Sequence, residues 1–87
     1  MSTFKLIVSS PDGNKFSGEV VKFDLRGVEG ELAIMAGHIP FVTSAVKCPC
    51  KITMPDESEI QAECDGGLLT VDAEKTTFIS GSFNILE

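Results

Sequence analysis

The side chains that could carry chemistry in this sequence are one histidine and three cysteines: His38, Cys48, Cys50 and Cys64. A histidine acting as a general base needs an orienting partner and a nucleophile within hydrogen-bond reach, and the sequence offers no second histidine. We therefore predict no catalytic residue and no enzyme. We interpret His38 as a corner residue that bonds to the backbone or faces a partner.

Imidazole and thiolate are soft ligands, so His38 and the cysteines could together hold zinc. The C-x-C spacing differs from the paired C-x-x-C spacing of structural zinc sites. Cys64 follows the inward-facing Ala62, and Cys50 shares a face with Ile52, where cysteine behaves as a small hydrophobe. We expect the thiols of Cys50 and Cys64 to be buried, and we expect no metal and no cofactor. The alternative is a free-standing module holding a soft metal through His38 and the cysteines. A third hypothesis, an enzyme with a reactive thiol, requires a lowered thiol pKa and an open cleft.

The histidine lies in residues 30–42, the stretch around which the chain is organised. Leu32 and Ile34 are two residues apart, as on one face of a short strand. Gly37 permits a backbone geometry that other residues avoid, and Pro40 fixes φ. The stretch predicts a strand, a tight corner and then a second extended segment.

Apolar side chains alternate through the rest of the chain, as in half-buried strands. The inward side chains should include Phe4, Leu6, Val8, Val21, Phe23, Leu25, Ile60, Ala62 and Cys64. Turn signals lie at 9–14, 27–30, 55–58 and 72–75, with a turn or bulge at 65–67, and Pro49 predicts an edge or bulge position. The tail should add a last short strand. Eight or more such strands predict one all-β domain over residues 1–87, a β-sandwich or barrel.

Composition narrows the function classes. The chain has 87 residues, a formal net charge of −6 and 43% hydrophobic residues. An acidic chain without a basic stripe is not expected to bind nucleic acid or anionic lipid. No stretch approaches the roughly 20 apolar residues that span a bilayer, and no signal peptide is recognisable. Three cysteines favour a reducing interior, so we expect a cytoplasmic protein with no direct membrane insertion.

Two motifs carry a resemblance to a known family. Residues 30–44, GELAIMAGHIPFVTS, resemble the GELGI-x-PGHAPL-x-T signature of the epsilon subunit of F-type ATP synthases, called delta in mitochondria. Residues 66–71, GGLLTV, resemble the family's GGFLEV. Ala33 and Ala36 replace the family's glycine and proline. The resemblance runs from Phe4 to about Ser80, nearly the whole chain.

The resemblance implies a flattened sandwich of about ten short strands and a non-catalytic role. Such a subunit binds the gamma subunit and the membrane rotor ring in the central stalk, and it transmits rotation for proton- or sodium-coupled ATP synthesis. It lies peripherally on the cytoplasmic face of the membrane. The matching positions imply an interface formed by Glu29, Gly30, Glu31, Leu32, His38, Ile39, Pro40, Phe41 and Val42, with Glu31 towards the ring.

The family's C-terminal helical hairpin, which can inhibit ATP hydrolysis, would begin near the end of this sequence. We therefore expect that hairpin to be absent and carry no self-inhibition over from the family. A naturally short chain and a piece of a longer protein both fit this ending.

Overall fold

Segments in which apolar and polar residues alternate form strands along the whole described chain. The structure is a computed structural model that describes residues 2–37 and 39–86. His38 lies outside the described residues. The eight strands of the described part are β1 (Phe4–Ser10), β2 (Gly13–Val20), β3 (Lys22–Gly27), β4 (Gly30–Met35), β5 (Phe41–Thr53), β6 (Glu59–Val71), β7 (Lys75–Ser80) and β8 (Phe83–Leu86). The predicted all-β fold is confirmed.

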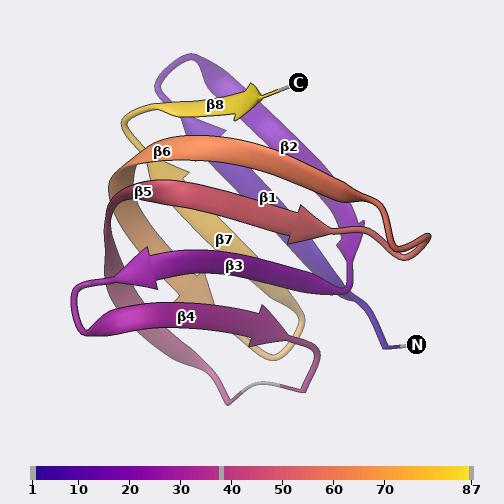
Figure 1. Cartoon of the computed structure of the whole chain (residues 1–87). Coiled ribbons are helices and arrows are strands. Elements are labelled where there is room, and N and C mark those ends of the chain that lie inside the picture. The colour runs from indigo at the N-terminus through magenta and orange to yellow at the C-terminus, as the bar shows by residue number, and fades with distance from the viewer. Residues whose placement is uncertain (1, 38, 87) are drawn as a thin grey trace.

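The strands form two layers that share β5 and β6 (Figure 1). The first layer holds β2, β1, β7, the end of β6 and the start of β5. The second holds β8, the start of β6, the end of β5, β3 and β4. Neighbouring strands run antiparallel except β1 and β7, which are parallel. β5 and β6 each belong to both layers, so each is one long strand where two short strands could have been counted. This explains why the described residues form eight strands and the expected number was about ten.

Both long strands bend where the layers meet. β5 leaves its ladder with β3 between Lys51 and Ala45, and Pro49 lies in this irregular segment. Proline has no N–H for a ladder, so an irregularity is the place where it is tolerated. This confirms the bulge predicted at Pro49. In β6 the bend falls at Gly66 and Gly67, whose φ angles are +87° and +154°. The predicted bulge is therefore inside one strand.

The core lies between the two layers. Its largest fully buried side chains include Phe23, Phe78 and Phe83. Phe78 packs against both other rings, with centroids 5.8 Å and 6.2 Å apart, in the tilted and edge-on arrangements that aromatic pairs prefer. Leu6 and Val8 are also fully buried, as the alternation predicts.

One predicted strand is broken in the structure. The alternation across residues 19–26 predicts a single strand with Val21 inward, but the chain bends at Val21 between β2 and β3. Val20 is fully buried instead. The Val21 N–H donates to the Thr53 carbonyl at 2.8 Å, which fixes the bend and shifts the phase of the alternation by one residue. Phe23 and Leu25 keep their predicted inward positions.

The predicted turns and the final strand agree with the structure. The 55–58 turn joins β5 to β6, the 72–75 turn joins β6 to β7, and β8 forms the last strand. Among the described residues there is no helix long and apolar enough to cross a membrane.

Candidate functional site

The first group of predicted interface residues forms the tip of the β3–β4 hairpin. Gly27 and Gly30 are paired at its end, and Glu29 lies in the turn between them. Gly30 has φ +128°, which a residue with a side chain rarely adopts, so glycine is needed to close this turn. Leu32 is half-buried and packs against the core, where its side chain lies beside Gly27. Leu32 is thus a supporting residue of the hairpin.

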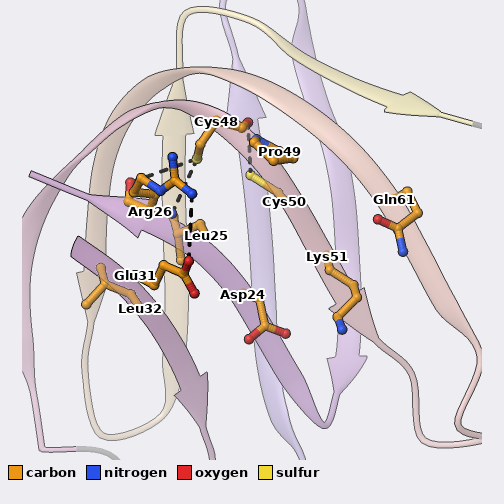
Figure 2. Close-up of a pocket in the computed structure, with 10 residues that line it drawn as sticks. All are labelled: Asp24, Leu25, Arg26, Glu31, Leu32, Cys48, Pro49, Cys50, Lys51 and Gln61. Carbon is orange, nitrogen blue, oxygen red and sulfur yellow. Dashed lines mark hydrogen bonds and ion pairs between the residues drawn. The ribbon is translucent and has the colours of Figure 1, made fainter.

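Glu31 stands on the outer surface of the same hairpin. It is paired across the strands with Arg26, and its Oε2 lies 3.7 Å from Arg26 Nη2. Both side chains are exposed, at 84% for Glu31 and 54% for Arg26. They overhang a shallow depression that Asp24, Lys51 and the cysteines of β5 also line (Figure 2). An ion pair this exposed contributes at most about 1 kcal/mol, so a partner could replace Arg26 at little cost.

The second predicted group lies at the other end of β4. Ile39 is 82% exposed and Pro40 is also exposed, whereas Phe41 is half-buried against the core. Six residues of β4 separate this corner from the hairpin tip, a span of about 17 Å. The structure therefore does not bring the two predicted groups into one site. Val42, 62% exposed, is the second residue of β5, which runs back towards the hairpin tip, where Ala45 pairs with Gly27.

Val42 belongs to a larger surface on the outside of the first layer. Ladder pairing places Ser44 opposite Leu68, Leu68 opposite Ile79, and Ile79 opposite Ser9. The next row is Val42, Thr70, Thr77 and Ile7. Each of these side chains alternates with a buried or inward-facing neighbour. We call this set the uncharged face: Ile7, Ser9, Val42, Ser44, Leu68, Thr70, Thr77 and Ile79.

The uncharged face is unusual for so charged a chain. The sequence has 13 acidic and 7 basic residues, yet none stands among these eight positions on four adjacent strands. Leu68 and Ile79 are 44% and 53% exposed. The first charged side chains on this side are Lys5 and Lys75, paired with one another beyond the second row. A contiguous apolar and hydroxyl surface with a charged rim is typical of a protein-binding surface.

Of the eight residues of this face, the sequence analysis placed only Val42 in an interface. It missed the other seven: Ile7, Ser9, Ser44, Leu68, Thr70, Thr77 and Ile79. It followed the inward-facing residues, and only the strand order shows that these outward positions adjoin. The signal available in the sequence was the absence of charge at outward positions around Leu68 and Ile79.

Cys50 and Cys64 are buried as predicted, and Cys48 is buried as well. Cys48, Cys50 and Cys64 are 6%, 2% and 4% exposed, and all three thiols are free. Burial raises the pKa of the Cys50 thiol above its ordinary range, and the neighbouring Cys64 and Cys48 thiols add to this. Burial also raises the pKa of Cys48, although the Arg26 N–H that donates to its Sγ opposes the shift. The reactive-thiol hypothesis needs the opposite shift, so these two cysteines do not meet its requirement.

The two packed layers define the class of this chain as a β-sandwich domain, and the uncharged sheet face is its distinguishing surface. Residues 3–84 match the family described as the ATP synthase Delta/Epsilon chain, beta-sandwich domain. The chain belongs to this family, and the resemblance of the two motifs is confirmed. Family membership does not support the alternative of a free-standing metal-binding module.

Two relatives in bacteria show how much of a full-length subunit this chain corresponds to. The chain is 30% identical over 80 residues to the ATP synthase epsilon chain of Brevibacillus brevis, covering 92% of this chain and 61% of that protein. It is 31% identical over 78 residues to the sodium ion specific ATP synthase epsilon chain of Acetobacterium woodii, covering 90% of this chain and 59% of the relative. The chain thus spans about three fifths of the length of these relatives.

Solved structures share the fold. A chain of the Euglena gracilis mitochondrial ATP synthase matches with a TM-score of 0.91 at 17% identity, over 98% of this chain and 54% of that one. A chain in the central stalk and c-ring structure of the Tetrahymena thermophila mitochondrial ATP synthase matches with a TM-score of 0.79 at 14% identity, over 94% and 66%. At these identities the likeness supports the sandwich architecture alone.

Proposed function

We propose that this chain is a central-stalk component of a rotary ATP synthase that binds the gamma subunit and the membrane rotor ring. The observation that carries the proposal is the uncharged face, a surface on four strands that a neutral protein partner could cover without burying an unpaired charge. Membership of the epsilon family supplies the identity of the partners. We assign the uncharged face to the gamma subunit.

The β3–β4 hairpin tip is assigned to the rotor ring, on the basis of the family motif that contains Glu31. Among the described residues, the contact seen for its carboxylate is the exposed ion pair with Arg26. A polar or basic group on a loop of the ring could therefore take its place. Glu29 and Gly30 complete the proposed contact surface at the tip, and Ile39 and Pro40 form a second, separate proposed contact at the far end of β4. His38 and Phe41, which the motif also includes, remain part of this proposal.

The role of the domain is mechanical. β5 and β6 run through both layers, so a force applied to one layer passes along covalent strands to the other. The close-packed core between the layers resists compression, and packed interiors transmit strain. Such a body suits the transfer of rotation from an ion-driven ring to a catalytic head. The domain itself carries out no catalytic step.

The same proposal fixes the location and the coupling. A subunit bound between gamma and the ring lies peripherally at the cytoplasmic face of the membrane. The Acetobacterium woodii relative is named as sodium ion specific, and we propose proton or sodium flow as the driving force here without choosing between them.

A binding measurement tests the proposal. The purified protein is mixed with the gamma subunit of the same organism, and the complex is examined by native mass spectrometry and titration calorimetry. We expect a one-to-one complex. If gamma shows no binding at tens of micromolar, or binds only the unfolded chain, the stalk function is wrong.

A further inference from the structure

The proposed function makes no use of the three thiols gathered where β5 and β6 cross between the layers. Their sulfur atoms all lie within 4.8 Å of one another. Cys48 of β5 is directly opposite Cys64 of β6 in the ladder, and the two Sγ atoms are 3.8 Å apart. Cys50 is opposite Ala62 instead. The cluster therefore contains one cross-strand pair and one additional thiol.

The backbone geometry of that pair suits a disulfide bond. Residues directly opposite one another in an antiparallel ladder have Cα atoms about 4.5–5.5 Å apart, within the range of about 4.4–6.8 Å found for disulfides. A sulfur–sulfur bond of about 2.05 Å requires the two Sγ atoms to approach by roughly 1.8 Å, which side-chain rotation supplies. Cys48 and Cys50 lie on the same strand two residues apart, about 6.6 Å, at the far limit of that range.

Cys48 is the thiol that a reagent in solution meets first. It lines the depression below Arg26 and Glu31 (Figure 2). It also lines a second depression between Lys47, Glu63 and Asn84. The Arg26 backbone N–H donates to Cys48 Sγ at 3.3 Å and offsets part of the burial that raises the pKa of this thiol. The thiolate is therefore a minor form, and we expect its reaction with a disulfide to be slow. Cys64 lines the second depression only. The pair thus has one buried thiol that lies beneath both depressions and a second thiol next to it.

We propose that Cys48 and Cys64 are a modification site that a small-molecule disulfide, such as oxidised glutathione, converts into a cross-strand disulfide joining β5 to β6. The Cys48 thiolate attacks one sulfur of the reagent, breaks its S–S bond and releases the first glutathione thiolate. Cys64, after losing its proton, attacks Cys48 Sγ, breaks the mixed disulfide and releases the second glutathione. The two protein thiols lose two protons and two electrons, and the reagent gains both as two thiols. Cys50 stays a free thiol.

The experiment incubates the purified, folded protein with oxidised glutathione and follows its mass and free thiols. We expect the mass to fall by two hydrogens, one thiol to remain reactive after denaturation, and a proteolytic map to join the Cys48 and Cys64 peptides. Three free thiols after prolonged incubation would overturn the proposal. So would a bond that includes Cys50, or stoichiometric metal bound to the thiols of the purified protein.

Two matched variants separate the roles of the thiols. Cys50→Ala should form the same bond at a rate within about threefold of the parent protein. Cys64→Ala should stop at a single glutathione adduct on Cys48. The assignment would be contradicted if Cys64→Ala gained no glutathione. It would also be contradicted if Cys50→Ala formed no disulfide bond while its far-UV circular dichroism matched that of the parent protein. If a variant fails to fold, the proteolytic map of the oxidised parent protein still shows whether Cys48 and Cys64 are joined.

Discussion

Asp72 is a single residue on which the position of the uncharged face depends. Its Oδ1 accepts the backbone N–H groups of Glu74 and Lys75, each at 2.8 Å, and its own N–H donates to the Lys75 carbonyl at 2.9 Å. This turn joins β6 to β7 and sets the register that places Leu68 beside Ile79. The carboxylate thereby fixes two residues of the binding surface without belonging to it.

The turn predicts a defined acid sensitivity. The N–H groups of Lys75 and Glu74 lower the pKa of Asp72 below its ordinary value. In the unfolded chain, where these bonds are absent, the carboxyl takes up its proton first as the pH falls. The contribution of Asp72 to stability is therefore present above about pH 4, the unfolded pKa, and is lost as the pH falls through the lower folded pKa.

We expect the free energy of unfolding of the parent protein to fall more steeply below pH 4 than that of Asp72→Asn, which keeps an acceptor but cannot titrate. Urea titrations followed by far-UV circular dichroism suit a chain without Trp or Tyr. Glu74→Gln removes a charge from the same turn but not the bonds that Asp72 accepts, so it should follow the parent curve. Parallel curves for Asp72→Asn and the parent protein would show that this carboxylate does not carry the effect.

At the scale of elements, the bend of β6 decides which side chains face outward beyond it. A Cβ added at Gly67 would overlap the Ile79 carbonyl oxygen and lie 2.9 Å from Ser80 Cα. Both are backbone atoms of β7, so no side-chain rotation relieves the clash. The Ser80 hydroxyl also donates to the Gly66 carbonyl and holds β7 against the bend.

Gly67→Ala should therefore destabilise the protein by about 2 kcal/mol or more, because it combines a backbone clash with an unfavourable φ. Gly81→Ala is the matched control, since a Cβ there meets nothing within 4 Å and its φ lies outside the range that favours glycine. We expect Gly81→Ala to leave the melting temperature within about two degrees of the parent, well below a 1 kcal/mol change for a domain of this size. Equal melting temperatures for the two variants would mean that the β6 bend tolerates a side chain.

The sequence predicts the strands and turns well because their information is local. Alternation identifies the inward positions of β1, β3 and β6, and proline or glycine pairs mark the turns and bends. It does not reveal that β1 and β7 pair in parallel, because that contact joins residues about 70 positions apart. The bend at Val21 is missed for a related reason, since a hydrogen bond to Thr53 fixes it.

The residues of the candidate site are likewise of two kinds: those that a local motif locates and those that only strand pairing brings together. The family motif locates Glu31 and Val42, both of which are exposed in the structure. It does not locate Leu68 and Ile79, which join Val42 on one face only through the pairing of β5, β6 and β7. The motif also includes Leu32, whose apolar side chain packs beside Gly27 and against the core instead of facing a partner.

Across the whole molecule, charge and apolar surface are segregated. The chain has a net charge of −6, and the 55–58 hairpin carries exposed Asp56 and Glu57, while the eight positions of the uncharged face carry no charge. Net charge opposes non-specific association, and the uncharged face is a region that a protein partner can cover closely. The central claim is that this face binds the gamma subunit.

The most direct test compares Leu68→Asp with Leu86→Asp. The two leucines are 44% and 46% exposed, but Leu68 lies on the uncharged face and Leu86 on β8 in the other layer. Calorimetry with gamma should show at least tenfold weaker binding for Leu68→Asp, about 1.4 kcal/mol, because an aspartate would be buried unpaired in the interface. Leu86→Asp should bind like the parent protein. Equal affinities for the two variants, with both folded, would contradict the assignment of gamma to this face.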